Sequence, residues 1–249
     1  MAKLLIALPN QDFDPTEVAV PWRILQAKGH ELVFATPDGG PASADPVMVT
    51  GQGLGLLAGV LRADANGRQA YEALLRDAAF QRPLAYAALQ ADEFAGLILP
   101  GGHAQGVRPY LESTALQAFV AAMFALDKPV GAICHGSVVA ARSRDAQGRS
   151  VLHGRRSTAL TAQMELTAWW LTRAWMGDYY RTYPETVQSE VTRALARPGD
   201  FDAGPVSLRR DAPGHLGLGF AVRDGNYLSA RWPGDAHRFA EEFALMLAR

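Results

Sequence analysis

Cysteine is nearly absent from this chain of 249 residues, and a single cysteine excludes an internal disulfide. An excess of either charge is missing too, because 24 Lys and Arg face 25 Asp and Glu, for a formal net charge of −1. Without a basic block the chain lacks the electrostatic footprint of a nucleic-acid or anionic-membrane binder. No apolar run reaches the length of a membrane span, and residues 1–8 are too short and wrongly flanked for a signal peptide. We therefore expect a reduced, cytoplasmic protein without nucleic-acid or membrane partners.

Several motifs that carry cofactor or metal chemistry are also missing. The sequence contains no Gly-x-Gly-x-x-Gly, no Walker loop, no Cys-x-x-Cys and no His-Glu-x-x-His. We therefore expect neither a cofactor nor a metal. With 49% hydrophobic and 20% charged residues and no compositional break, residues 1–249 are expected to form one domain.

The most informative stretch runs from Ala95 to Arg142. Short apolar runs at 96–99 and 130–133 each stop at small or polar residues, which is typical of buried parallel strands that deliver loops to the carboxyl edge of a sheet. Between them, Ser113 precedes apolar residues at i, i+3, i+4 and i+7 spacing, so a capped crossover helix is predicted. The stretch is a βαβ unit, and the expected fold is a doubly wound, mainly parallel α/β sandwich with its site at the ends of these strands.

Cys134 is the candidate nucleophile. It follows a strand and precedes Gly136 and a run of small and branched residues, which predicts a sharp strand-to-helix turn of the nucleophile-elbow kind. A helix N-terminus beside the sulfur would lower the pKa of the thiol. The alternative is a buried cysteine that acts as a small hydrophobic residue.

The beginning of the chain predicts strand, helix and strand at 3–8, 14–27 and 31–36. Asp14 is the expected N-cap, Pro15 stands at the first helical position, and Glu17 falls three residues after the cap. Glu17 is therefore either a capping-box carboxylate or a group that reaches the Cys134 sulfur from the same edge of the sheet.

Residues 40–92 form a long insertion between predicted strands, with a helix expected at 68–80. So long a connection is usually functional, which predicts a lid or pocket wall; a surface excursion that helps dimerisation is the alternative. Gly101 and Gly102 could bring backbone N–H groups to an oxyanion together with that of His135, with Gly136 close by, although Pro-Gly-Gly is also ordinary turn chemistry. His103 is either a substrate contact or a solvated loop residue.

The remainder predicts further strands and helices. Strands are expected at 157–160, 206–208, 215–222 and 227–230, and helices near 185–196 and after Asp235. Glu165 lies in the first turn of another helix, where the dipole favours an anion. Arg231, near a strand end, is either a contact for a substrate carboxylate or, more simply, a surface residue.

These loops carry a family resemblance. Leu99-Pro100-Gly101-Gly102-His103, Ala132-Ile133-Cys134-His135-Gly136 and the Asp14-Pro15-Thr16-Glu17 turn together resemble the ThiJ/PfpI superfamily of the class I glutamine amidotransferase-like fold, in its chaperone-like glyoxalase III branch. The resemblance implies a flavodoxin-like fold and a homodimer. No histidine is followed two residues later by Glu, as the amidotransferases of this fold require, so glutamine hydrolysis is disfavoured.

The resemblance also implies a reaction. Cys134 would attack a small reactive carbonyl, with Glu17 as hydrogen-bonded acid and base, in a glutathione-independent glyoxalase or deglycase that gives a 2-hydroxy acid. An acid about one strand and one turn after the elbow would orient His135. Glu165 fits this interval, and Glu185 and Asp178 are the alternative candidates for this acid. Peptidase, amidase or isonitrile hydratase chemistry and a redox-sensing or holdase role are the alternatives.

Overall fold

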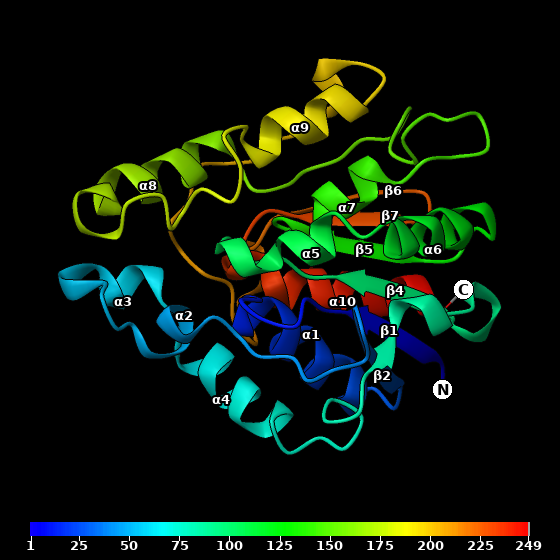
Figure 1. Cartoon of the computed structure of the whole chain (residues 1–249), viewed down its shortest axis with the longest axis horizontal. Helices are drawn as coiled ribbons and strands as arrows, with labels where there is room; N and C mark the ends of the chain where they lie inside the picture. The colour runs from blue at the N-terminus through cyan, green and yellow to red at the C-terminus, as the bar shows by residue number, and fades with distance from the viewer. Residues whose placement is uncertain (249) are drawn as a thin grey trace.

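The computed structural model describes residues 1–248, and Arg249 lies outside the described residues. A seven-stranded sheet forms the centre of the molecule (Figure 1). Its strands are β1 (Lys3–Ala7), β2 (Glu31–Thr36), β3 (Leu84–Ala85), β4 (Gly96–Leu99), β5 (Val130–Ile133), β6 (Ala221–Asp224) and β7 (Tyr227–Ala230).

The strand order is β3-β2-β1-β4-β5-β7-β6, with every pairing parallel except that of β6 with β7. Strand β4 pairs directly with β5, Leu97 opposite Val130, so the predicted βαβ unit is confirmed. The expected doubly wound, mainly parallel α/β fold is confirmed as well. Because β1, β4 and β5 are neighbours, the loops that follow them meet at one edge.

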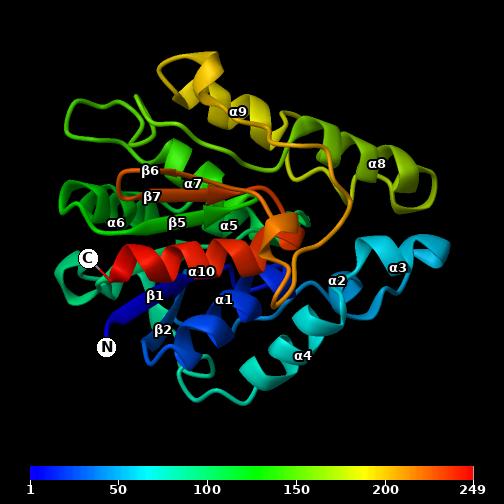
Figure 2. The same ribbon diagram turned by 180° about the vertical axis from the view of Figure 1, so that it is seen from behind.

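Helices cover both faces of the sheet. The helices are α1 (Pro15–Ala27), α2 (Pro46–Thr50), α3 (Ala58–Leu61), α4 (Ala65–Leu74), α5 (Arg108–Leu111), α6 (Thr114–Ala125), α7 (Gly136–Arg142), α8 (Ala162–Met176), α9 (Val187–Ala194) and α10 (Ala236–Leu247). Helices α5, α6 and α7 lie over the face seen in Figure 1, and α1 and α10 over the face seen in Figure 2. The predicted caps are present: the side chains of Asp14 and Ser113 accept from backbone N–H groups in the first turns of α1 and α6.

The core consists of two clusters, one on each face. Successive residues of β1 alternate between them: Leu5 and Ala7 pack with α5, α6 and α7, whereas Leu4 and Ile6 pack with α1 and α10. Alternation of this kind is what a strand buried on both sides requires. The central strands are consequently held rigidly, together with the loops at their ends.

Several predicted strands are absent from the described residues. Segment 157–160 makes only a single bridge, from Ser157 to Phe201; segment 206–208 is irregular; and segment 215–222 contributes only the first two residues of β6. Conversely, the insertion supplies the short edge strand β3, which the sequence did not predict. Apolar side chains at 206 and 208 suggested a strand. Val206 is 76% and Leu208 is 74% exposed, so these side chains lie in solvent, whereas those of the central strands are buried.

The chain extends beyond the sheet mainly at the end where the site lies. Helices α3 and α8 project there, opposite the N-terminus and the end of α10, as both views agree. Among residues 1–248, no helix combines the length and the apolar character needed to cross a bilayer.

Candidate active site

Cys134 occupies the predicted elbow. It directly follows β5, has φ of +58°, and is separated from α7 by His135 alone. This left-handed conformation is costly for a residue with a side chain, so the surrounding packing must hold it. At Gly136 an added Cβ would lie 1.9 Å from the carbonyl oxygen of Leu99, so only glycine lets the elbow pack this closely against the end of β4.

Glu17 is brought to the elbow from the first turn of α1. Its side chain is completely buried, and its Oε2 accepts a hydrogen bond from the Gly101 N–H at 2.8 Å. Its carboxyl neighbours the Cys134 thiol closely enough to affect the pKa of the sulfur. Burial, and then the nearby Asp14, raise the pKa of Glu17 well above its ordinary value, which favours the protonated form of the carboxyl.

The position of the Glu17 proton follows from the hydrogen bonds. Because Oε2 already accepts from an N–H, the proton belongs on Oε1. This oxygen is buried and has no other partner among the described residues. A hydroxyl on Oε1 is therefore free to donate to the neighbouring sulfur or to a substrate oxygen.

The thiol itself differs from expectation. Burial first, and then the nearby carboxyls of Glu17 and Asp14, raise the pKa of Cys134 well above its ordinary value. The backbone N–H of His135 donates to the sulfur and opposes this rise. The prediction that a helix N-terminus would lower the pKa is thus wrong. The resting group is a thiol, which needs a base to become a nucleophile.

His135 is in position to be that base. Its Nδ1 lies 3.4 Å from the Cys134 sulfur, and its Nε2 lies 3.0 Å from Oγ1 of Thr182. Thr182 donates its only hydroxyl proton to the carbonyl oxygen of His103, so it must accept from Nε2–H. The proton therefore resides on Nε2 and leaves Nδ1 free to accept from the thiol. Burial lowers the pKa of His135 to about 3, which keeps the imidazole neutral.

The structure does not bring Glu165 to His135, which corrects the expectation of an orienting acid. Oε2 of Glu165 accepts from the Val187 N–H, the first of α9, at 3.0 Å, and Oε1 lies 3.8 Å from Arg181. The competitors are elsewhere too: Glu185 pairs with Arg193, and Asp178 accepts from Trp169. The partner of His135 is the hydroxyl of Thr182, for which the sequence offered no signal.

The four candidate binding residues separate into two pairs. The Gly101 N–H is already committed to Glu17, Gly136 packs against Leu99, and neither residue lines the cavity. Gly102 and His103 do line the cavity above Cys134. The Gly102 N–H makes no hydrogen bond within the described part of the chain, which leaves it as an available donor.

His103 is packed rather than solvated. Its ring stacks on that of Tyr180, with centroids 4.3 Å apart, and its Nε2 lies 3.9 Å from a carboxylate oxygen of Asp45. Burial lowers the pKa of His103, so this imidazole is neutral as well. Tyr180 was not singled out from the sequence; it reaches the cavity from the segment that follows α8.

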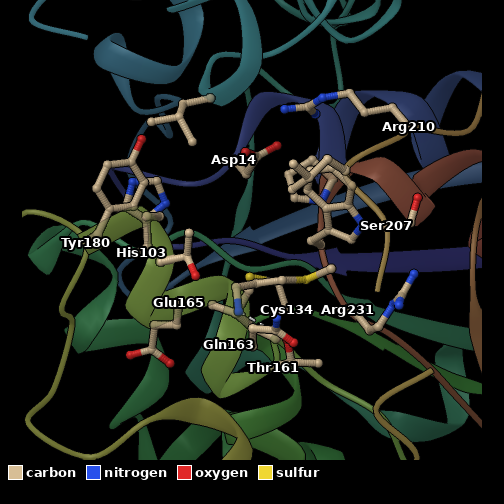
Figure 3. Close-up of a pocket in the computed structure, with 18 of the residues that line it drawn as sticks. Asp14, His103, Cys134, Thr161, Gln163, Glu165, Tyr180, Ser207, Arg210 and Arg231 are labelled. Carbon is tan, nitrogen blue, oxygen red and sulfur yellow. Dashed lines mark hydrogen bonds between the residues drawn. The ribbon is translucent and has the colours of Figure 1, made fainter. Parts of the chain in front are cut away.

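Cys134, Glu17, Gly102, His103 and Tyr180 line one cavity of about 530 Å³. Figure 3 shows Cys134 in its lower part, with His103 and Tyr180 to one side and Asp14 with Arg210 above. The Asp14 carboxyl has two roles, because it caps the N-terminus of α1 and also lines the cavity. Burial raises its pKa to about 6, partly offset by Arg210.

Arg231 corrects a further expectation. It is completely buried, not a surface residue, and its guanidinium pairs with Asp235 at 2.9 Å. It also donates to the carbonyl oxygen of Pro205. Its charge is therefore already compensated within the protein, and it fixes the segment that borders the cavity.

Within residues 1–248, no group of three or more His, Cys, Asp or Glu side chains is arranged to hold a metal ion. The described site brings together a thiol, an imidazole and buried carboxyls, groups that suit the addition of sulfur to an electrophilic carbon with local proton transfer.

The chain is similar to several known proteins. It is 24% identical over 243 residues to a deglycase of Pyrococcus abyssi and 23% identical over 243 residues to the deglycase PfpI of Pyrococcus furiosus, covering 98% of both chains in each case. Its fold is similar to that of glyoxalase III from Candida albicans, with a TM-score of 0.70, 17% identity, and coverage of 98% of this chain and 97% of that one.

A family model described as ThiJ/PfpI family-like matches residues 8–194. That range includes the Glu17 turn, both strand-end loops and the elbow, as well as α8 and α9. It is well over half of the chain, and the described fold agrees with that of the structural neighbour above. The chain therefore belongs to the ThiJ/PfpI family.

Proposed function

We propose that this protein is a cysteine-dependent enzyme of the glyoxalase or deglycase type, which converts α-oxoaldehydes to 2-hydroxy acids without glutathione. The observation that carries the proposal is the meeting of three groups at the elbow: the Cys134 thiol, the Nδ1 atom of His135 and the carboxyl of Glu17. Relatives named deglycase and a structural neighbour named glyoxalase III support the same reaction class.

The first step forms a carbon–sulfur bond. His135 Nδ1 takes the thiol proton, and the sulfur adds to the aldehyde carbon of the substrate. The oxygen that develops negative charge is stabilised by the Gly102 N–H and receives the proton of Glu17 Oε1. The product of this step is a hemithioacetal, with Glu17 now a carboxylate and His135 an imidazolium.

The second step moves a proton between two carbons. The Glu17 carboxylate removes the proton from the sulfur-bearing carbon, and the imidazolium of His135 protonates the adjacent ketone oxygen, which gives an enediol. Return of the proton from Glu17 to the second carbon, with loss of the hydroxyl proton to His135, yields a thioester. Water then cleaves the thioester to the 2-hydroxy acid and the free thiol. One carbon is oxidised and its neighbour reduced, so no external oxidant is needed.

The redox-sensor alternative receives less support. A sensor thiol is exposed and has a low pKa, whereas Cys134 is buried and its pKa is raised. The homodimer implied by the family resemblance stays a prediction, which light scattering tests.

The decisive experiment measures 2-hydroxy acid formed from methylglyoxal in the absence of glutathione. Wild type and Cys134→Ala are compared, because both retain the same 24 Lys and Arg and so consume methylglyoxal equally by adduct formation. We expect lactate from wild type and a loss on the order of a thousandfold or more in the variant. Absence of lactate from wild type, or its undiminished formation by the variant, would overturn the proposal.

A further inference from the structure

The cavity above Cys134 is far larger than a three-carbon substrate requires. Its volume of about 530 Å³ falls in the range of roughly 300–1,000 Å³ that holds drug-sized ligands. One molecule of liquid water takes up about 30 Å³, and methylglyoxal has only five non-hydrogen atoms. A small dicarbonyl bound at the sulfur would therefore leave most of this space to water.

Three segments away from the sheet enclose this space, and we call them the wall. They are residues 45–62, helix α8 and residues 203–210, which come together at the end of the molecule where α3 and α8 project (Figure 1). The groups that act on the carbonyl, by contrast, come from the loops at the ends of the strands.

The wall is largely apolar. Its cavity-facing members include Met48, Leu61, Met164, Ala168, Leu171 and Val206. Two of them are methionines, whose flexible thioethers adapt to ligands of varied shape. Polar side chains of the wall, such as Gln163, Thr167 and Arg210, also face the cavity but are fewer, so a surface of this composition favours hydrocarbon over a polar sugar or a hydrated dicarbonyl.

The mouth of the cavity gives independent evidence. Val206 is 76%, Leu208 74% and Leu171 50% exposed, and all three line the same cavity. Large aliphatic side chains gathered in water around an opening mark a surface that is covered in the functional state. A ligand that extends from the sulfur toward the mouth would cover them.

We propose that the substrate carries an apolar chain of roughly four or more carbons beyond the reactive dicarbonyl, lying along the wall toward the mouth. This inference rests on the proposed function and names its substrate class: long-chain aliphatic α-oxoaldehydes rather than methylglyoxal. The dicarbonyl contacts Cys134, Gly102 and Glu17, and the chain contacts Met164, Leu61 and Val206.

The first test is a homologous series of methyl-, butyl- and hexylglyoxal. Burial of one methylene stabilises by about 0.8 kcal/mol, up to about fourfold in kcat/KM for each, so hexylglyoxal should exceed methylglyoxal by at least about thirtyfold. A flat or declining series overturns the inference and leaves the proposed function standing.

The second test fills the cavity. Ala168→Phe introduces a ring into the wall and should lower kcat/KM for hexylglyoxal at least tenfold more than for methylglyoxal. Ala118→Phe, on the exposed face of α6, is the matched control and should affect neither substrate. Leu61→Ala removes an apolar contact without a clash and should flatten the series if Ala168→Phe folds poorly. Equal losses for both substrates in both wall variants contradict the inference.

The third test does not depend on turnover. Calorimetry with Cys134→Ala should show 2-hydroxyoctanoate binding at least thirtyfold more tightly than lactate. Binding without turnover of any aldehyde would reject the proposed function and retain the apolar site. If 2-hydroxyoctanoate does not bind and Val206→Asp dissociates a dimer, the mouth is a contact between copies and the inference fails.

Discussion

The floor of the cavity and its wall are built in different ways. The floor includes Glu17 and Cys134 and is held by short contacts near the strand ends: Glu17 accepts from the Gly101 N–H, and the Cys134 sulfur lies 3.4 Å from Nδ1 of His135. The wall is joined by side chains that reach between distant segments: the Trp175 indole donates to the Gly53 carbonyl at 2.8 Å, and Arg210 donates to that of Arg62 at 3.1 Å. Changes in the floor should therefore alter the chemistry, whereas changes in the wall should alter affinity.

After loss of the nucleophile itself, the largest effect is expected at Glu17. In Glu17→Gln the amide N–H₂ takes the place of Oε1 and can donate to the neighbouring sulfur, but it cannot exchange a proton with the substrate. We expect kcat to fall by roughly 10²–10⁴, while alkylation of Cys134 by iodoacetamide stays within a few-fold of wild type. Glu31→Gln, at the exposed start of β2, is the control. Equal loss of turnover and alkylation would mean that Glu17 serves only to organise the elbow.

A smaller effect on the floor is expected at Thr182, which acts on His135 and not on substrate. Thr182→Val keeps the shape but removes the acceptor for Nε2–H, so kcat should fall about tenfold to a hundredfold. Thr182→Ser should restore it. Nitrogen NMR of His135 should show the Nε2–H tautomer in wild type and a mixture in the valine variant. An unchanged tautomer in that variant would remove Thr182 from the mechanism.

On the wall, Arg210→Met should act on KM more than on kcat. The substitution removes the hydrogen bonds that join residues 203–210 to the carbonyl groups of Val60 and Arg62. We expect KM for hexylglyoxal to rise roughly threefold to tenfold, about 1 kcal/mol of binding. Arg209→Met, at the exposed neighbouring position, should have no effect. A fall in kcat larger than the rise in KM would show that the wall takes part in the chemistry.

The smallest effect on turnover is expected for Glu165→Gln, with kcat within about twofold of wild type because Glu165 does not contact His135.

The effect of Glu165→Gln is expected on the free energy of unfolding instead. Burial raises the pKa of Glu165 to about 7, so folding favours the protonated form. The resulting stabilisation is complete below the unfolded value of about 4.3 and is lost as pH rises through 7, by roughly 1–3 kcal/mol. The glutamine variant should lack this pH dependence in thermal melts, whereas Glu185→Gln, at a half-exposed position, should retain it.

The parts that the sequence predicted are those in which local pattern and fold agree. Apolar runs that end in small residues located β4 and β5, and the cap at Asp14 located α1. Glu17, although its capping-box position offered an alternative, lies beside Cys134 because β4 pairs with β1 on one side and with β5 on the other.

The parts that it did not predict depend on long-range packing. Thr182 lies in an irregular segment, and nothing in its neighbours distinguishes it from other loop hydroxyls. Glu165 had a suitable interval along the chain, but α8 directs it toward the start of α9. The rise in the pKa of Cys134 reflects burial among carboxyls, which spacing along a chain does not reveal.

The left-handed backbone at Cys134 also has a consequence for the order of folding. It is held by contacts with the end of β4. The carboxyl beside its sulfur, that of Glu17, accepts a hydrogen bond from Gly101, which lies 84 positions after Glu17 along the chain. Contacts that close such long loops form late in folding, because the chain loses the entropy of loop closure before the contacts stabilise it. A nascent or partly unfolded chain therefore carries an ordinary cysteine in an ordinary loop. The contact between Cys134 and Glu17 forms only when the sheet is complete, so the chemistry proposed for this site depends on the folded chain.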